Sequence, residues 1–432
     1  MLLVVKALFA ALKKRGFPRK NERMKEQEDT MAFKDIAKKT ATALAGVFLT
    51  AACALPITGC DALNGLLNPE KPPVIYEESE LLKDIYEDYF PIGAAVSTNA
   101  LNSYEKLMPH FNSVTAEWQM KWAQLEPSEG KYSYQSADSI VEWAKQNGKK
   151  VRGHCLVWYK SLPSWLKKKV TNKTAALNYI DRYVNDTIEH FGDSVYVWDV
   201  ANEVLHNSVS QTQLDGKDYY RTGTGEVAGE NDVDWYALCG VDFIKQAFRS
   251  AANARDRLNL DDLDLYYNDY NLNSPTKRAA CVEMVKMLQQ DGIAIDGVGM
   301  QAHYRLPDYQ ANPEAFMKKF EDSVKAFTEL GVDVQITELD ISVHASNTAP
   351  SQFDNLPLEV EMAQAQMFAD IFEVCRRYST PWKSGAGTVT GVTTWGVADD
   401  RHWLNDYHKD YPLIFGREQA YKRAYYEITA FD

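Results

Sequence analysis

Two glutamates each end a segment that is typical of a buried strand. Residues 196–202 form a mostly apolar run that leads into Asn202-Glu203, and residues 334–337 form a run with two β-branched aliphatic residues that leads into Glu338. A strand of this kind delivers a carboxylate at its carboxyl end. Hydrolysis of a glycosidic bond needs two carboxyl groups, one on each side of the bond. The two glutamates therefore predict paired-carboxylate chemistry, provided that the fold brings them together.

The elements that must position them alternate regularly over residues 79–432, without a linker, a repeat or a low-complexity break. The expected strands are residues 92–96, 113–116, 151–157, 195–202, 263–268, 297–301, 334–338 and 391–395. Helical patterns lie between them, at residues 138–146, 175–190, 236–254, 277–291, 312–330 and 360–378. This alternation predicts an α/β fold, a single (β/α)8 TIM barrel with its cleft at the carboxyl ends of the strands.

Polar and aromatic residues also gather at the ends of most of the other expected strands. They are Glu117, Trp118 and Lys121, then His154 and Trp158, then Asn268 and Tyr270, then Gln301 and His303, and finally Trp395 and Trp403. Any one of them alone is more often a packed structural residue than a functional one. Their joint occurrence at strand ends indicates one cleft lined by polar and aromatic groups.

These segments resemble the family 10 glycoside hydrolases, the endo-β-1,4-xylanase family, over about residues 80–430. The matching segments are residues 198–203 (WDVANE), 336–340 (ITELD), 152–158 (RGHCLVW), 267–271 (YNDYN), 296–303 (DGVGMQAH) and 394–397 (TWGV). The resemblance implies a retaining endo-1,4-β-xylanase that cleaves internal bonds of xylan or arabinoxylan by double displacement and uses no cofactor.

The resemblance also implies roles for single residues. Glu338 would be the nucleophile, and Glu203 the general acid that later acts as base. His303 would lie between Glu338 and Asp340, and Asn202 would hold the 2-hydroxyl of the sugar. The implied substrate-binding residues are Glu117, Lys121, His154, Trp158, Tyr270, Gln301, Trp395 and Trp403.

The sequence departs from the family pattern mainly in the glycone half of the expected cleft. Trp118, Tyr159 and Ser161 stand where the family has asparagine, histidine and glutamine, and Arg423 replaces a proline in a closing segment. The indole of Trp118 has one donor and no acceptor, so it cannot replace an amide. It either faces the cleft, where it stacks on a sugar or crowds a substituent, or turns into its loop as packing.

Two other functions fit the same pattern. One keeps the mechanism and changes the polymer to another β-1,4-glucan. The other is a non-catalytic carbohydrate-binding surface lipoprotein, which would be expected to lack one of the two carboxylates, whereas Glu203 and Glu338 are both present. An assay for new reducing ends on xylan separates the enzyme from the binding protein.

Composition limits the partners of the protein. The 432 residues are 45% hydrophobic with a net charge of −13, which disfavours nucleic acid and suits a neutral substrate. Cys155, Cys239, Cys281 and Cys375 are widely spaced, and no pair has metal-ligand spacing. We therefore expect no structural metal. A monomeric protein is also expected.

The first 60 residues are interpreted as a targeting segment rather than as part of the fold. Residues 1–30 are interpreted as an upstream or mis-set start segment, and residues 31–60 resemble a bacterial lipoprotein signal that ends at Cys60. Cys60 would then carry the lipid, residues 61–78 would form a tether, and the only link to the membrane would be this anchor. The expected location is the bacterial cell surface or the periplasm; a plain secretory signal, which would release the protein, is the alternative.

Overall fold

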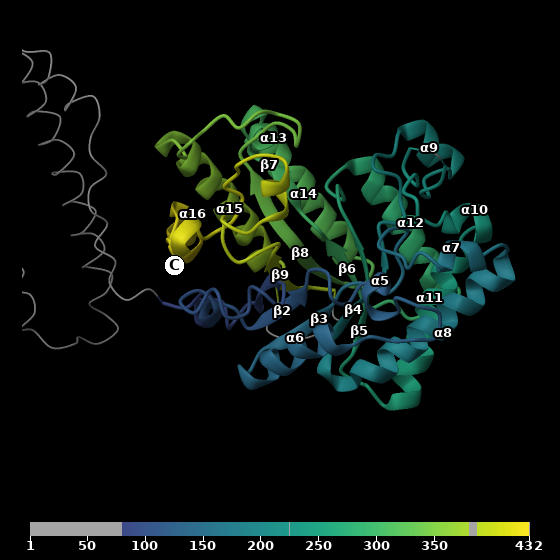
Figure 1. Ribbon diagram of the computed structural model, residues 1–432. Helices are drawn as coiled ribbons and strands as arrows, with labels where there is room; N and C mark the ends of the chain where they lie inside the picture. The colour runs from purple at the N-terminus through teal and green to yellow at the C-terminus, as the bar shows by residue number, and fades with distance from the viewer. Residues whose placement is uncertain (1–79, 224, 380–386, 432) are drawn as a thin grey trace, which may run out of the picture. The chain divides into compact units, whose positions relative to one another are not determined.

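Eight parallel strands form a closed barrel (Figure 1). The computed structural model describes residues 80–223, 225–379 and 387–431. The strand order around the barrel is β1 (Ile92–Val96), β2 (Ser113–Ala116), β3 (Lys150–Gly153), β4 (Val197–Asn202), β5 (Asp264–Asp269), β6 (Gly297–Met300), β8 (Asp333–Ser342) and β9 (Val389–Thr394), and β9 pairs with β1. This confirms the predicted TIM barrel.

A ninth short strand extends the barrel wall on one side. β7 (His303–Arg305) pairs in parallel with the last three residues of β8. Between β6 and β7, Ala302 has a left-handed backbone with φ 61°. The chain therefore turns at this point and pairs again with β8 further along that strand. His303 thus lies beyond the part of β8 that pairs with β6.

Helices surround the strands in Figure 1. The longer ones are α6 (Gln135–Gln146), α8 (Lys173–Phe191), α11 (Asp242–Leu258), α12 (Pro275–Gln290), α14 (Pro313–Thr328) and α15 (Leu358–Arg377). The shorter ones are α4 (Leu82–Ile85), α5 (Trp122–Leu125), α7 (Leu166–Lys169), α9 (Gln211–Gly216), α10 (Trp235–Cys239), α13 (Leu306–Ala311) and α16 (Arg423–Thr429). The described residues also contain four 3-10 turns: η1 (Met108–His110), η2 (Gly192–Ser194), η3 (Trp403–Asp406) and η4 (Arg417–Gln419).

The longer helices bury apolar residues, and four of these helices are in contact with barrel strands. In α8 the buried residues include Ile180, Tyr183, Val184 and Ile188, whose spacing of three or four residues marks one side of a helix. α6 contacts β2 and β3, α11 contacts β4 and β5, α14 contacts β8, and α15 contacts β9. Among the described residues no helix combines the length and the apolar character that a membrane crossing requires.

The centre of the barrel holds a buried ionic network. Both terminal nitrogens of Arg152 on β3 donate to the Asp199 carboxylate on β4, at 2.6 and 2.5 Å, and its Nε donates to Gln335 on β8 at 2.9 Å. Burial alone would raise the pKa of Asp199, but the charge of Arg152 and the hydrogen bond to His154 outweigh it and hold the pKa below its usual value. The network joins three strands beneath the cleft.

Several predicted strand boundaries were wrong. The third strand was expected to reach residue 157, but β3 ends at Gly153; beyond it, the Val157 backbone pairs only with the end of β4. The strand expected at residues 334–338 is longer, because β7 extends its pairing to Ser342. The predicted signal segment, Cys60 and the tether lie outside the described residues.

Candidate active site

Glu203 and Glu338 both lie at the carboxyl end of the barrel. Glu203 directly follows β4 and is partly exposed, with a left-handed backbone at φ 52° that turns the chain out of the strand. Glu338 lies within β8 and is only 4% exposed. The two carboxylates thus come from β4 and β8, two strands that are not neighbours in the barrel, and they differ in their access to solvent.

Three side-chain amides connect the two carboxylates. The Asn268 amide nitrogen donates to Glu338 Oε1 at 2.8 Å and to Asn202 Oδ1 at 3.0 Å. The Gln301 amide nitrogen donates to Glu203 Oε1 at 3.1 Å and to Asn202 Oδ1 at 3.4 Å. Asn202 Oδ1 therefore accepts twice, while Asn202 Nδ2 is buried without a hydrogen-bond partner among the described residues.

His303 lies between Glu338 and Asp340. Its Nε2 is 3.1 Å from Glu338 Oε2, and its Nδ1 is 2.7 Å from Asp340 Oδ2. Burial alone would lower the pKa of His303, but the charge and hydrogen bond of Asp340, followed by those of Glu338, raise it to about 10. The imidazolium can then donate to both carboxylates at once.

The same contacts keep Glu338 ionised. Burial alone would raise the pKa of Glu338, but the hydrogen bond from His303 and the nearby charge of His154 outweigh it and hold the pKa below its usual value. Asp340 also receives a hydrogen bond from Trp403 Nε1 at 2.9 Å. Despite its burial, Asp340 has a pKa held far below the usual range by His303 and then by His402, whose Nε2 lies 3.2 Å away.

Aromatic and charged side chains extend the site on one side of the carboxylates. Trp158 Nε1 donates to Glu203 Oε2 at 3.0 Å, and the Lys121 ammonium lies 4.9 Å from the centre of the Trp158 ring. Burial raises the pKa of Glu117, while the charge of Lys121 opposes that rise. The charge of Glu338 also contributes to the raised pKa of Glu117.

Three aromatic contacts close the site above His303. The Trp403 ring centre is 5.4 Å from that of His303, and the Trp395 ring centre is 5.3 Å from that of His154 and 6.3 Å from that of His303. These flat rings stand edge-on to the two imidazoles. The arrangement provides apolar walls beside directed hydrogen-bonding groups, as the recognition of sugars requires.

Comparison with known proteins gives the family. Residues 81–431 match the model of glycosyl hydrolase family 10. The chain belongs to this family. A β-1,4-xylanase from Dictyoglomus thermophilum is 39% identical, over 81% of this chain and 90% of that protein. Endo-1,4-β-xylanase A from Thermotoga maritima is 33% identical over 84% of this chain, which spans 31% of that longer relative.

Solved structures agree with this family assignment. The crystal structure of an endo-1,4-β-xylanase from Caldicellulosiruptor owensensis matches with a TM-score of 0.70 and 29% identity. The match covers 82% of this chain and 100% of that one. The described barrel is therefore a family 10 barrel.

The departures from the family pattern occupy different environments. Trp118 is 52% exposed, and the Lys121 ammonium lies 4.2 Å from its ring centre. Tyr159 is buried, with the Arg221 guanidinium 4.5 Å from its ring centre. The Ser161 backbone carbonyl accepts a hydrogen bond from the Ala123 backbone. Trp118 is therefore the departure that presents a large surface to solvent; it does not pack into its loop.

Arg221 was missed by the sequence analysis. It belongs to the connection between α9 and α10, and no motif or strand end marks it. Its Nε donates to the Glu203 backbone carbonyl at 2.8 Å, and one terminal nitrogen donates to the Tyr270 hydroxyl at 2.9 Å. Arg221 therefore ties Tyr270 to the turn that carries Glu203.

Asn268 and Lys277 were also not assigned a role. Asn268 was part of a recognised segment, and its position at the end of an expected strand was the available signal. Lys277 lies on α12, where it is fully buried against Asp269 at 2.9 Å and lies 4.0 Å above the Tyr270 ring. Its place in the helical pattern of residues 277–291 gave no indication of this contact.

Proposed function

We propose that this protein is a retaining endo-1,4-β-xylanase that hydrolyses internal β-1,4 bonds of xylan or arabinoxylan by double displacement. The observation that carries the proposal is the chain of three amides that links Glu203 to Glu338 across the end of a family 10 barrel. The names of the xylanase relatives support the choice of polymer.

In the first step Glu338 is the nucleophile. Its lowered pKa keeps it ionised, so Oε2 or Oε1 can form a bond to the anomeric carbon while the bond to the leaving oxygen breaks. Glu203 supplies the proton to that oxygen. Hydrogen bonds from Trp158 and Gln301 hold its partly exposed carboxyl group in place. The products are a glycosyl-enzyme and a shortened sugar chain.

In the second step a water molecule replaces the leaving sugar. Glu203 now takes a proton from water, whose oxygen bonds to the anomeric carbon and releases Glu338. Two inversions at the same carbon give net retention. His303 is a positioning residue here, since it holds Glu338 and balances its returning charge.

Asn202 has a free hydrogen-bond donor that can bind a sugar hydroxyl. Its Oδ1 is occupied by Asn268 and Gln301, so its unpartnered Nδ2 is the group that can donate to the 2-hydroxyl. That contact strengthens as positive charge develops on the neighbouring carbon in the transition state. We assign Glu117, Lys121, His154, Trp158, Gln301, Trp395 and Trp403 to the glycone side, and Tyr270 to the leaving-group side.

Product stereochemistry tests this mechanism directly. Proton NMR of freshly cleaved xylo-oligosaccharides should show the β-anomer first. An α-anomer as the first product would rule out double displacement at Glu338.

The name of one relative supports a β-1,4-glucan as an alternative substrate. A protein from Thermoclostridium stercorarium that is 30% identical over 89% of this chain is named a thermostable celloxylanase. Reducing-end assays on xylan, arabinoxylan and cellulose, run side by side, distinguish the two substrates. Release from cellulose alone would replace xylan with a β-1,4-glucan, and no release from any of the three would favour the carbohydrate-binding alternative.

We also propose that the protein acts as a monomer anchored by a lipid on Cys60 to a bacterial membrane, at the cell surface or in the periplasm. The support for the anchor is the basic and then apolar segment before Cys60. Mass spectrometry of the native amino terminus should find a diacylated or triacylated Cys60. A free, unmodified protein in the medium that is unaffected by Cys60→Ser would indicate simple secretion, and light scattering tests the monomer.

A further inference from the structure

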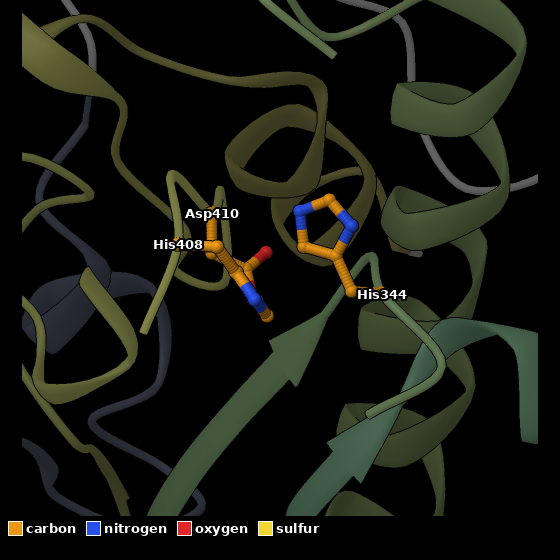
Figure 2. Close-up of side chains that lie close together, drawn as sticks. All are labelled: His344, His408 and Asp410. Atoms are coloured by element: carbon orange, nitrogen blue, oxygen red, sulfur yellow. The ribbon is translucent and has the colours of Figure 1, made fainter. Parts of the chain in front are cut away.

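Two clusters of polar side chains have no part in the chemistry proposed above. The first consists of His344, His408 and Asp410, beyond the end of β8 (Figure 2). His344 Nε2, on the side of the other two groups, donates to the Lys409 backbone carbonyl at 3.0 Å, and its Nδ1 is turned away from them. His344 therefore offers no lone pair to an ion shared with the other two groups. The second cluster surrounds Arg221, beside the turn after β4.

The chain that follows Glu203 returns to its own starting point at Arg221. Leu205 and Tyr220 form an antiparallel bridge, and the Arg221 backbone nitrogen donates to the Val204 carbonyl at 2.8 Å. These contacts place Arg221 beside the turn that carries the proposed general acid. Its side chain is only 2% exposed, so its charged group is held away from solvent.

The Arg221 guanidinium holds three parts of the leaving-group side. Its Nε donates to the Glu203 backbone carbonyl at 2.8 Å, and its terminal nitrogens donate to the Tyr270 hydroxyl at 2.9 Å and to Asn207 Oδ1 at 2.7 Å. The planar fork of an arginine fixes the directions of all three hydrogen bonds at once. The turn of Glu203, the ring of Tyr270 and the amide of Asn207 are therefore held as one unit.

The amide of Asn207 has a fixed orientation. Its Oδ1 accepts from Arg221 and from the Tyr270 hydroxyl, and because an arginine can only donate, this end of the amide is the oxygen. The backbone of Asn207 is held as well, since its nitrogen donates to Glu226 at 3.1 Å and its carbonyl accepts from Asn271 at 3.3 Å. Asn207 is exposed, and its Nδ2 makes no hydrogen bond to the described residues.

Tyr159 packs against the same guanidinium. The centre of its ring lies 4.5 Å from the Arg221 guanidinium carbon, and its backbone carbonyl accepts from Val233 at 3.2 Å. A cation over an aromatic ring is attracted to it, and the attraction is stronger away from water. Tyr159 stands where the family has histidine, a departure expected in the glycone half, but this contact connects it through Arg221 to the leaving-group side.

We propose that Asn207 binds the sugar unit on the leaving-group side, where Nδ2 donates to one of its hydroxyl groups, and that Arg221 is the positioning residue for this contact. The ligand is the β-1,4-linked sugar whose bridging oxygen Glu203 protonates, so the proposal rests on the xylanase function proposed above. The Tyr270 hydroxyl is already bonded to Arg221 and Asn207. Its ring can pack against the sugar, and Asn207 supplies the directed donor that a hydroxyl group requires.

Two substrates with different leaving groups test the role of Asn207. Xylopentaose has sugar on both sides of the cleaved bond, whereas phenyl β-xylobioside has a ring without hydroxyl groups on the leaving-group side. In Asn207→Ala the ratio of kcat/KM for xylopentaose to kcat/KM for phenyl β-xylobioside should fall about three- to tenfold, which is the effect of one lost hydrogen bond.

Asn185→Ala is the matched control. Asn185 lies on the outer helix α8, where its Nδ2 donates to the Asp181 backbone carbonyl at 2.9 Å. This variant should keep the wild-type ratio. A wild-type ratio in Asn207→Ala would overturn the proposal, because the amide would then make no contact with the departing sugar. Failure of the wild type to cleave either substrate would overturn the xylanase function, and the proposed subsite with it.

Arg221→Met tests the positioning role. The variant keeps an unbranched side chain but removes all three hydrogen bonds, so Asn207 and the turn of Glu203 lose their common support. The comparison substrate is 2,4-dinitrophenyl β-xylobioside, whose leaving group departs without a proton. The ratio of kcat/KM for xylopentaose to kcat/KM for this substrate should fall at least about tenfold, further than in Asn207→Ala. Equal losses on both substrates would show that Arg221 serves only the fold and would overturn its positioning role.

Discussion

At Asn202, the two ends of one amide side chain have different surroundings. The oxygen accepts from Asn268 and Gln301, which fixes the orientation of the amide, and the buried nitrogen has no hydrogen-bond partner among the described residues. A strand-end asparagine beside a glutamate was visible in the sequence. The fixed orientation was not, because it depends on amides that reach the same point from β5 and from the turn after β6.

Changing His303 should move the acidic side of the activity profile. His303→Asn removes the hydrogen bond and charge that hold the pKa of Glu338 down, so Glu338 will protonate at a higher pH. The acidic limb of kcat/KM should therefore shift to higher pH, and kcat/KM at the optimum should fall at least about tenfold. Steady-state kinetics on a xylo-oligosaccharide across pH measure both effects.

Trp403→Phe is the control for this experiment. It removes the hydrogen bond from Trp403 Nε1 to Asp340 but leaves His303 against Glu338. Its acidic limb should stay near that of the wild type. An unshifted limb in His303→Asn would show that Glu338 is kept ionised by other groups.

Replacing Trp118 by the family's asparagine should improve activity on short, undecorated xylo-oligosaccharides. Trp118 is exposed and contacts Lys121, and Lys121 keeps its contact with Trp158 when the indole is removed. An amide restores a donor and an acceptor worth about 1.4 kcal/mol at most, so kcat/KM should rise up to about tenfold. Trp118→Phe, which keeps a flat ring, should show no such gain.

A substantial loss of activity in Trp118→Asn, with unchanged Tm, would contradict this reading. It would show that the indole is itself a stacking surface for sugar. Full activity in Trp118→Phe together with that loss would identify the flat ring as the recognised feature.

On the scale of single elements, β3 has two features that its hydrophobic pattern does not reveal: its early end and its close contact with β4. Residues 154–157 continue the apolar pattern, yet the regular pairing of β3 stops at Gly153. A Cβ atom on Gly153 would lie 2.3 Å from the Trp198 ring of β4. The close approach of β3 to this indole needs a residue without a side chain, and a hydrophobic pattern does not reveal such a contact.

Gly153→Ala should accordingly destabilise the barrel. The added methyl group meets the fully buried Trp198 ring, which has no room to move, so the unfolding free energy should fall by about 1–3 kcal/mol or more. Gly216→Ala is the control, because no atom lies within 4 Å of its added Cβ, and its effect should be neutral or slightly stabilising. Denaturant titrations compare the two; equal stability of both variants would mean that β3 can shift away from Trp198.

On the scale of the whole molecule, the barrel was predictable because the same strand–helix unit repeats along the chain. Eight alternations of strand and helix leave few ways to bury every strand, and the carboxyl ends of parallel strands share one face. Glu203 and Glu338 could therefore be placed in one cleft from the sequence. Arg221, Lys277 and the cluster of His344, His408 and Asp410 could not, since they come from long connections or from inside a helix and meet only in the folded chain.

The buried site should also give the whole protein a characteristic dependence of stability on pH. The pKa of His303 is raised to about 10 in the folded protein, from about 6.5 when unfolded, so its contribution is complete below about pH 6.5 and is lost as pH rises through 10. The pKa values of Asp199, Glu338 and Asp340 are lowered, so their contribution is present above about pH 4 and is lost in more acidic solution.

These shifts predict that the folded protein gains most from its buried charges between about pH 4 and 6.5. Chemical unfolding at a series of pH values should show the free energy of unfolding declining by a few kcal/mol from about pH 6.5 toward 10. In His303→Asn this part of the decline should be missing: the variant should be less stable than wild type at pH 6, and the two curves should converge toward pH 10. Parallel curves over that range would show that His303 does not change its charge there, and the hydrogen bonds of His303 would then have to be those of a neutral ring.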